Sequence, residues 1–150
     1  MKDVIVIVGP TGVGKTKLSI ELAKEFDGEI INADSVSIYK DLDIGSAKPT
    51  KYEQMEVPHH LIDIREVTEE YSIFDYQKDA RRKIDEIQKR GKTVIMVGGT
   101  GLYIKSALYD YNFTENTTYN EYSNFTNEEI LEKIHSINSD LDIHVNNRKR

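Results

Sequence analysis

The chain has 150 residues, enough for one domain with a hydrophobic core but too few for two domains of ordinary size. Its net charge of −6 means that any nucleic acid must be held by a local basic patch, because the average field repels a polyanion. The absence of cysteine excludes disulfides, thiolate metal sites and cysteine nucleophiles, and is typical of a reducing compartment. The N-terminal apolar run, residues 4–8, is too short for a signal peptide or a membrane span, so we predict a cytoplasmic protein without membrane contact.

Four apolar runs predict the strands of a parallel sheet. Residues 4–8, Val-Ile-Val-Ile-Val, are apolar at every position, which is typical of a strand buried on both faces. Helical patterns separate the runs, and this alternation is typical of α/β proteins with right-handed crossovers. The predicted strands are residues 4–8, 29–33, 60–64 and 93–97.

Two amphipathic patterns predict helices between these strands. Residues 15–26 place Leu18, Leu22 and Phe26 on one face, which we expect to pack on the sheet. Residues 73–89 form a second pattern of helical period. Its apolar face consists of Tyr76, Ala80, Ile84 and Ile87.

Capping signals mark the ends of the predicted helices. Ser72 with Asp75 is a capping arrangement for the helix over 73–89, and Gly91 is a stop signal after it. Thr126 with Glu129 can cap a further short amphipathic helix. These local signals therefore predict helix boundaries independently of the hydrophobic pattern.

The composition of the chain changes after Tyr109. The following stretch is rich in Asn, Thr and Tyr without an apolar period, which is typical of a linker, and a short helix begins near Glu128. We therefore predict a core domain over 1–110 and a linker with a shortened helical insertion over 111–145. Residues 146–150 are predicted to start a C-terminal segment that is cut off.

A phosphate-binding loop follows the first predicted strand. Its glycines allow backbone N–H groups to converge on phosphate oxygens, and the next helix directs its positive end to the same place. Lys15 adds a cation, and the Thr16 hydroxyl can bind Mg²⁺. A chance glycine turn is disfavoured, because the motif follows an apolar strand and begins a helix. The predicted diphosphate- or nucleotide-binding residues are Gly9, Pro10, Thr11, Gly12, Val13, Gly14, Lys15 and Thr16.

The loop alone does not specify the reaction. A P-loop motor or GTPase normally has an acid at the end of a hydrophobic strand, whereas the run over 93–97 ends in Gly98-Gly99-Thr100-Gly101. A small-molecule kinase usually closes an arginine-bearing lid, but the sequence between Gly91 and Asn147 has no arginine. Both observations disfavour phosphoryl transfer without excluding it.

Two acids are candidates for the site: Asp63, within the run over 60–64, and Asp34. Asp34 follows the second predicted strand, and the carboxyl ends of parallel strands share one crevice, so we expect Asp34 to face the same crevice as Lys15. The alternative is that Asp34 or Ser35 only caps the next helix. His59 and His60 have metal-ligand chemistry, but adjacent strand residues point to opposite faces, so we expect packed histidines.

Five motifs in order resemble those of the tRNA dimethylallyltransferases, also called tRNA isopentenyltransferases. They are GPTGVGKT, INADSVSIYKDLDIGSAKPT, VPHHLIDI, YSIFDY and VGGTGLYIKSAL, within residues 4–108, and the resemblance resumes at DIHVNNRKR. The resemblance implies an α/β fold of the P-loop NTPase type. In this chain about four parallel strands are expected, flanked by helices and followed by a short helical C-terminal segment.

The resemblance also implies a reaction. A dimethylallyl group moves from dimethylallyl diphosphate to N6 of the adenine 3′-adjacent to the anticodon in tRNA, and pyrophosphate leaves. The loop then holds a leaving group with Mg²⁺ on Thr16. Asp34 matches the family's base, and Thr100 matches a residue beside the reacting centre, with a plain turn hydroxyl as its alternative. The implied tRNA-binding residues are Asp34, Ser35, Val36, Ser37, Lys149 and Arg150.

The sequence departs from the family in several places. Ser37 stands where the family usually has Gln, which weakens the expected reading of adenine, and Val145 replaces the usual Pro. The insertion between Tyr111 and Asn146 is short, and the family's last strand and later arginines are absent. We therefore expect a truncated or degenerate, monomeric member that keeps the diphosphate pocket. A small-molecule kinase and a non-catalytic phosphate- or RNA-binding remnant remain as alternatives.

Overall fold

The structure is a computed structural model that describes residues 3–43, 46, 48–111, 113 and 125–137. The chain divides into two compact units, residues 1–112 and 113–150. The first unit contains the sheet, and the second contains a single helix in its described residues. Neither unit has a described helix that is both long enough and apolar enough to cross a bilayer.

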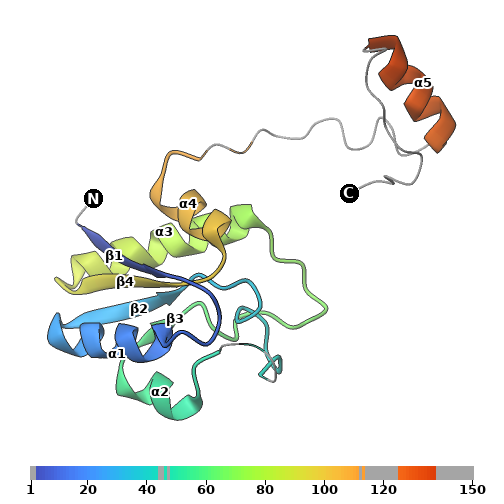
Figure 1. Cartoon of the computed structure of the whole chain (residues 1–150). Helices are drawn as coiled ribbons and strands as arrows, with labels where there is room; N and C mark the ends of the chain where they lie inside the picture. Colours follow the sequence, from blue (N-terminus) through green and yellow to red (C-terminus); the bar gives the residue numbers. More distant parts are fainter. Residues whose placement is uncertain (1–2, 44–45, 47, 112, 114–124, 138–150) are drawn as a thin grey trace. The chain divides into compact units, whose positions relative to one another are not determined.

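The first unit is built on a sheet of four parallel strands in the order β1-β4-β2-β3 (Figure 1). The register places Val4 beside Val94 and Ile30 beside Ile95. The predicted four-stranded parallel sheet is therefore confirmed. The strands are β1 (Val4–Val8), β2 (Gly28–Asn32), β3 (His59–His60) and β4 (Thr93–Gly98).

Helices cover both faces of this sheet (Figure 1). One face carries α1, which packs on β1, β2 and β4, and the other carries α3, against which α4 packs. The sequence analysis predicted α1 and α3 and missed α2 and α4. The helices of this unit are α1 (Lys15–Glu25), α2 (Lys51–Glu56), α3 (Ile73–Lys89) and α4 (Gly101–Leu108).

Two hydrophobic cores form because side chains alternate across the strands. On β4, Val94 and Met96 pack with the α3 side, whereas Ile95 packs with the α1 side. The predicted buried face of α3 is confirmed, including the fully buried Tyr76. Its hydroxyl donates to the carbonyl of Asn32 at 2.8 Å, so α3 is also tied to the end of β2.

Two expectations about burial are wrong. β1 lies at an edge of the sheet, and its Val8 is 62% exposed, because only β4 pairs with it in the described residues. On α1, Leu18 and Phe26 are exposed, and the helix buries Ser19, Ile20 and Ala23 instead.

The third strand is shorter than predicted. A strand was expected over 60–64, but only His59 and His60 pair with β2. Leu61 and Asp63 have φ values of 62° and 55°, in the left-handed region, so the extended backbone is interrupted. The chain then bends back toward the segment after β2, and Asp63 donates from its backbone to the carbonyl of Ser37 at 3.1 Å.

The predicted capping arrangements are confirmed. Ser72 accepts from the backbone of Asp75, whose carboxylate accepts from the backbone of Ser72 at 2.9 Å. In the second unit, α5 (Asn127–Ile137) begins in the same way, and the backbone N–H of Thr126 donates to the carboxylate of Glu129 at 2.8 Å. In both cases local hydrogen bonds satisfy N–H groups that a helix end leaves unpaired.

Candidate functional site

The phosphate loop joins β1 to α1 with two glycines in left-handed conformation. Gly12 has a φ of 85° and Gly14 a φ of 90°, a region that residues with a β carbon rarely adopt. Gly14 is the N-cap of α1 and supplies no side-chain cap. The first turn of α1 also has no acidic side chain, so its N–H groups and positive end are open to an anion.

Lys15 and Thr16 follow at the first positions of α1. In the structure the Lys15 ammonium donates to the carbonyl of Pro10 at 2.7 Å and so folds over its own loop. The hydroxyl of Ser19 donates to the backbone carbonyl of Thr16 at 2.7 Å, so this bond does not involve the Thr16 hydroxyl. Both Lys15 and Thr16 line a cavity of about 370 Å³.

This cavity brings the phosphate loop together with the segment after β2. Its other walls come from β2, β4, the segment that leads into α2, and β3 with the turn after it. Ile30, Ile62 and Val97 are its apolar lining. The predicted site residues in its lining are Gly12, Gly14, Lys15, Thr16, Asp34 and Ser37. The predicted site residues that the structure describes outside this lining are Gly9, Pro10, Thr11, Val13, Ser35, Val36 and Thr100.

Asp34 is held in a tight turn directly after β2. Its Oδ1 accepts from the backbone N–H of Val36 at 2.9 Å, which is an Asx-turn. The first helix after it in the described residues begins only at Lys51, so the alternative role of capping the next helix is wrong. Asp34 is half-buried and faces the same cavity as Lys15, as the parallel-sheet argument predicts.

Thr100 binds the residue that follows Asp34. Its Oγ1 accepts from the backbone N–H of Ser35 at 3.1 Å, and its own N–H donates to the carbonyl of Ala33 at 3.0 Å. The hydroxyls of Thr100 and Ser35 are 3.4 Å apart. Thr100 therefore joins the turn after β4 to the turn that carries Asp34, although it does not itself line the cavity.

The remaining predicted tRNA-binding residues differ in position. Ser37 is 2% exposed and lines the cavity, whereas Val36 is 46% exposed on the surface. Lys149 and Arg150 lie outside the described residues. The structure thus brings Asp34 and Ser37 to the phosphate loop.

Lys48 is a cavity residue that the sequence analysis did not select. Its side chain is 3% exposed, and its ammonium donates to Asp43 at 2.8 Å, Asp63 at 2.7 Å and the carbonyl of Tyr39 at 2.9 Å. Burial lowers the pKa of Lys48, but these carboxylates outweigh burial and raise it. All three donors are used, so Lys48 fixes the cavity wall and has no spare donor for a ligand.

His59 also lines the cavity. Its Nδ1 donates to the carbonyl of Val57 at 2.8 Å, and its Nε2 is buried without a hydrogen-bond partner among the described residues. Burial lowers the pKa of His59, although the Val57 bond opposes this, so the ring is neutral at pH 7.

The neighbouring histidine points elsewhere, as expected for adjacent strand residues. His60 Nε2 lies 2.6 Å from the carboxylate of Glu29, which Arg90 also binds at 2.8 Å. In the described part of the chain, no three histidine or acidic side chains gather into a metal-binding group. The two histidines therefore have different partners and do not form a shared metal site in the described residues.

The cavity residues fit Mg²⁺ bound together with a diphosphate. Mg²⁺ prefers oxygen ligands and usually keeps several waters while it binds substrate phosphates. Thr16 offers one hydroxyl at the N-terminus of α1, and Asp34 is a carboxylate in the same cavity. This sparse oxygen set is sufficient only if phosphate oxygens supply further ligands.

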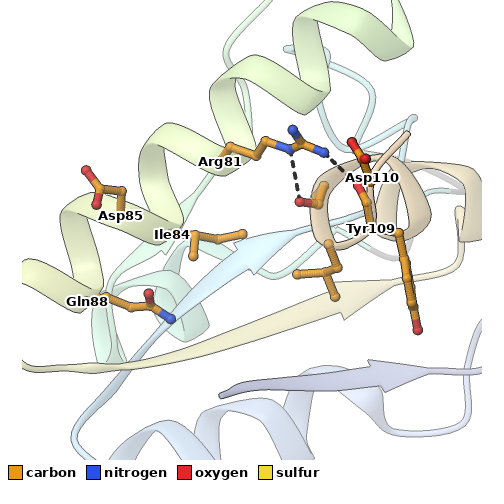
Figure 2. A pocket seen from close by; sticks show the side chains of 8 residues that line it. Arg81, Ile84, Asp85, Gln88, Tyr109 and Asp110 are labelled. Atoms are coloured by element: carbon orange, nitrogen blue, oxygen red, sulfur yellow. Dashed lines mark hydrogen bonds between the residues drawn. The ribbon is translucent and has the colours of Figure 1, made fainter. Parts of the chain in front are cut away.

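A second cavity, of about 500 Å³, lies between α3 and the end of α4 (Figure 2). Arg81 crosses it and donates to the carbonyls of Ala107 at 3.2 Å, Ser106 at 3.0 Å and Tyr109 at 2.6 Å. These bonds satisfy carbonyls that the end of a helix leaves unpaired. None of the predicted site residues lines this cavity, so the first cavity is the candidate site.

The fold and the site define the class of protein: a P-loop α/β protein in which a phosphate loop and a carboxylate share one cavity. Comparison with protein families refines this class. The family described as IPP transferase matches residues 37–150. The chain therefore belongs to the IPP transferase family.

Named relatives agree with this assignment. A tRNA dimethylallyltransferase from Enterococcus faecalis is 61% identical over 111 residues, which cover 74% of this chain and 36% of that protein. One from Bacillus licheniformis is 49% identical over 157 aligned residues, covering 98% of this chain and 50% of that protein. The chain thus spans half or less of the length of these curated relatives.

Solved structures are similar as well. A full-length tRNA isopentenylpyrophosphate transferase from Bacillus halodurans matches with a TM-score of 0.75 and 38% identity, covering 98% of this chain and 52% of that one. A eukaryotic dimethylallyltransferase acting on tRNA matches with a TM-score of 0.80 and 33% identity, covering 98% and 39%. The predicted P-loop fold and family are therefore confirmed.

Proposed function

We propose that this chain contributes the diphosphate-binding and base-bearing part of a tRNA dimethylallyltransferase. The donor is dimethylallyl diphosphate, and the acceptor is N6 of the adenine 3′-adjacent to the anticodon in the tRNA anticodon stem-loop. The observation that carries the proposal is the shared cavity of Lys15, Thr16 and Asp34. The names of the relatives support the same reaction class.

The proposed step joins C1 of the dimethylallyl group to N6 of adenine while the bond from C1 to the diphosphate oxygen breaks. The diphosphate leaves with the electron pair, and Asp34 accepts the proton that N6 loses. The N–H groups at the start of α1 and the ammonium of Lys15 stabilise the charge that the leaving group gains. Adenine must leave its base stack to reach a cavity of this kind.

Mg²⁺ is part of the proposal. Thr16 and phosphate oxygens would hold it, and its charge would further stabilise the departing diphosphate. Thr100 is proposed to lie beside the reacting centre through its bonds to the turn of Asp34. Because tRNA is the proposed acceptor, we place the reaction in the cytoplasm, with the chain acting as a monomer.

The first test is a transfer assay with dimethylallyl diphosphate, Mg²⁺ and an anticodon stem-loop RNA. The key variant is Asp34→Asn, which keeps an acceptor for the Val36 N–H but cannot take a proton. We expect a loss of about 10²–10⁴-fold. Asp85→Asn, on the exposed side of α3, is the matched control and should transfer at the wild-type rate. Equal rates for Asp34→Asn and wild type would exclude Asp34 as the base.

The second test separates the proposal from its alternatives. Calorimetry with Mg²⁺ compares a non-hydrolysable dimethylallyl diphosphate analogue with ATP. Tighter binding of the analogue supports a prenyl diphosphate pocket, whereas tighter binding of ATP would favour a small-molecule kinase. Analogue binding without any transfer would identify a binding remnant.

A further inference from the structure

Asn32, the last residue of β2, binds the backbone of Asp34 through its side-chain amide. The side chain lines the cavity while the residue is only 6% exposed. Its Oδ1 accepts from the backbone N–H of Asp34 at 3.0 Å, and its Nδ2 donates to the carbonyl of Asp34 at 2.9 Å. One amide therefore binds both backbone groups of the residue that carries the candidate base.

The same amide reaches a third group. Its Nδ2 also donates to the carbonyl of Leu61 at 2.9 Å, across 29 residues of sequence. Both N–H bonds of the amide are thus used, and an apolar or purely accepting side chain could not replace them. Asn32 joins the end of β2, the turn of Asp34 and the turn after β3.

Leu61 supplies an independent observation. It is buried at 6% exposure and has a φ of 62°, a conformation in which a branched side chain is strained. Such a conformation persists only where surrounding contacts favour it. Here the left-handed turn aims the carbonyl of Leu61 at the Asn32 amide, so the strain serves this contact.

The backbone of Asn32 is itself fixed. Its carbonyl accepts from the hydroxyl of Tyr76, which is fully buried and stacked on Tyr103 with ring centroids 3.9 Å apart. Asn32 therefore links the backbone of Asp34 to Tyr76 in the hydrophobic core. The Asp34 carboxylate itself accepts from the backbone N–H of Val36, within its own turn.

We infer that Asn32 is a positioning residue that holds Asp34 in place to accept the proton of the attacking amine. The inference rests on the proposed function, and it adds a residue that acts through the base without contacting substrate. A general base must lie within hydrogen-bond reach of its proton, and small displacements from reactive geometry are costly.

The first test needs no turnover. Amide hydrogen exchange is measured at Asp34 in wild type, Asn32→Ala and Asn32→Ser. Loss of the side-chain acceptor should accelerate exchange at the Asp34 amide about tenfold in Asn32→Ala. A serine hydroxyl can restore the bond to the N–H two residues on, more weakly, so Asn32→Ser should fall between them.

Gln77→Ala is the matched control. Gln77 is buried, and its amide also bridges two backbone carbonyls, those of Ser106 at 2.9 Å and Tyr111 at 2.8 Å, away from the candidate site. It should leave exchange at the Asp34 amide unchanged. Unchanged exchange in Asn32→Ala, or equal acceleration in Gln77→Ala, would overturn the inference.

The second test uses transfer kinetics. Asn32→Ala should lower kcat about 100-fold with the KM for dimethylallyl diphosphate within about twofold, because the loop that binds the diphosphate is unaltered. Asn32→Ser should recover part of kcat, and Gln77→Ala should match wild type. A kcat that stays at the wild-type value in Asn32→Ala overturns the positioning role. If wild type shows no transfer, the proposed function fails, and hydrogen exchange still decides whether Asn32 holds Asp34.

Discussion

Gly98 and Ala33 approach so closely that a β carbon on Gly98 would overlap the backbone carbonyl of Ala33. Gly98 is the last residue of β4, and Ala33 directly precedes Asp34. The N–H of Ala33 also donates to the carbonyl of Val97 at 2.7 Å. This close contact between neighbouring strands sets the point from which the turn of Asp34 begins.

Gly98→Ala should therefore displace the Asp34 turn. We expect the free energy of unfolding to fall by about 1–3 kcal/mol, as for overpacked sites, together with a loss of prenyl transfer. Gly101→Ala is the control, since a β carbon there meets no atom within 4 Å and lies in the first turn of α4. Chemical denaturation measures both variants, and equal stability of Gly98→Ala and wild type would contradict the prediction.

Lys15→Met should weaken binding of the diphosphate. The change removes a cation from the phosphate loop while keeping a long side chain. Hydrogen bonds to charged groups are worth about 1.5–3 kcal/mol, which corresponds to about 10- to 150-fold in the dissociation constant. Calorimetry with Mg²⁺ and the non-hydrolysable dimethylallyl diphosphate analogue measures this dissociation constant. Lys89→Met, which removes an exposed ammonium paired with Asp85 on α3, should bind as wild type does.

Lys48→Met and Lys51→Met compare a buried and an exposed partner of the same carboxylate. Both ammonium groups bind Asp63, but the Lys48 side chain is 3% exposed and that of Lys51 is 75% exposed. Lys48→Met should cost about 1–3 kcal/mol of unfolding free energy, because the largely buried Asp63 carboxylate and the carbonyl of Tyr39 lose a donor. Lys51→Met should cost less than about 1 kcal/mol. Equal losses in denaturation experiments would contradict this role of burial.

Glu29 should make stability depend on pH in the acidic range. Burial raises the pKa of Glu29, but hydrogen bonds and charges from Arg90 and His60 outweigh burial and lower it below the ordinary 4.5. The unfolded chain therefore binds a proton at higher pH than the folded chain does. The stabilisation is complete above about pH 4.5 and is lost as pH falls through the lower pKa of the folded state.

The measurement is the free energy of unfolding of wild type and Glu29→Gln between about pH 3 and 7. Glu29→Gln should lose less stability on acidification than wild type. Glu21→Gln removes a carboxylate that is 62% exposed on α1 and should keep the wild-type pH dependence. A wild-type slope in Glu29→Gln would show that other carboxylates account for the acid sensitivity.

Local features of the sequence predicted local structure well. The helix over 73–89 was predicted with its buried face, because an apolar stripe of helical period was joined to a capping pair at Ser72 and Asp75. The phosphate loop was predicted because its glycines and Lys15 lie within a few residues of each other. α2 and α4 were missed, although Thr50 and Glu53 form the same kind of capping pair before α2.

The errors concern features that depend on distant parts of the chain. The apolar run of β1 did not reveal an edge position, because pairing depends on which strands lie beside it. Leu18 and Phe26 were expected in the core, but the face of α1 is chosen by the surface on which the helix packs. Leu61 interrupts a predicted strand because its turn is stabilised by a contact with Asn32.

By itself, the sequence determined the α/β class, the phosphate loop, the acid after the second strand and the family resemblance. These rest on residues close together in sequence, where backbone preferences and motif spacing act directly. Only the tertiary structure decided that Asn32, Lys48 and Gly98 support the site. The Asn32 amide binds the carbonyl of Leu61, the buried Lys48 ammonium binds Asp63, and Gly98 leaves room for the backbone of Ala33. Strand order and chain reversal bring these groups together, and no local pattern in the sequence encodes that.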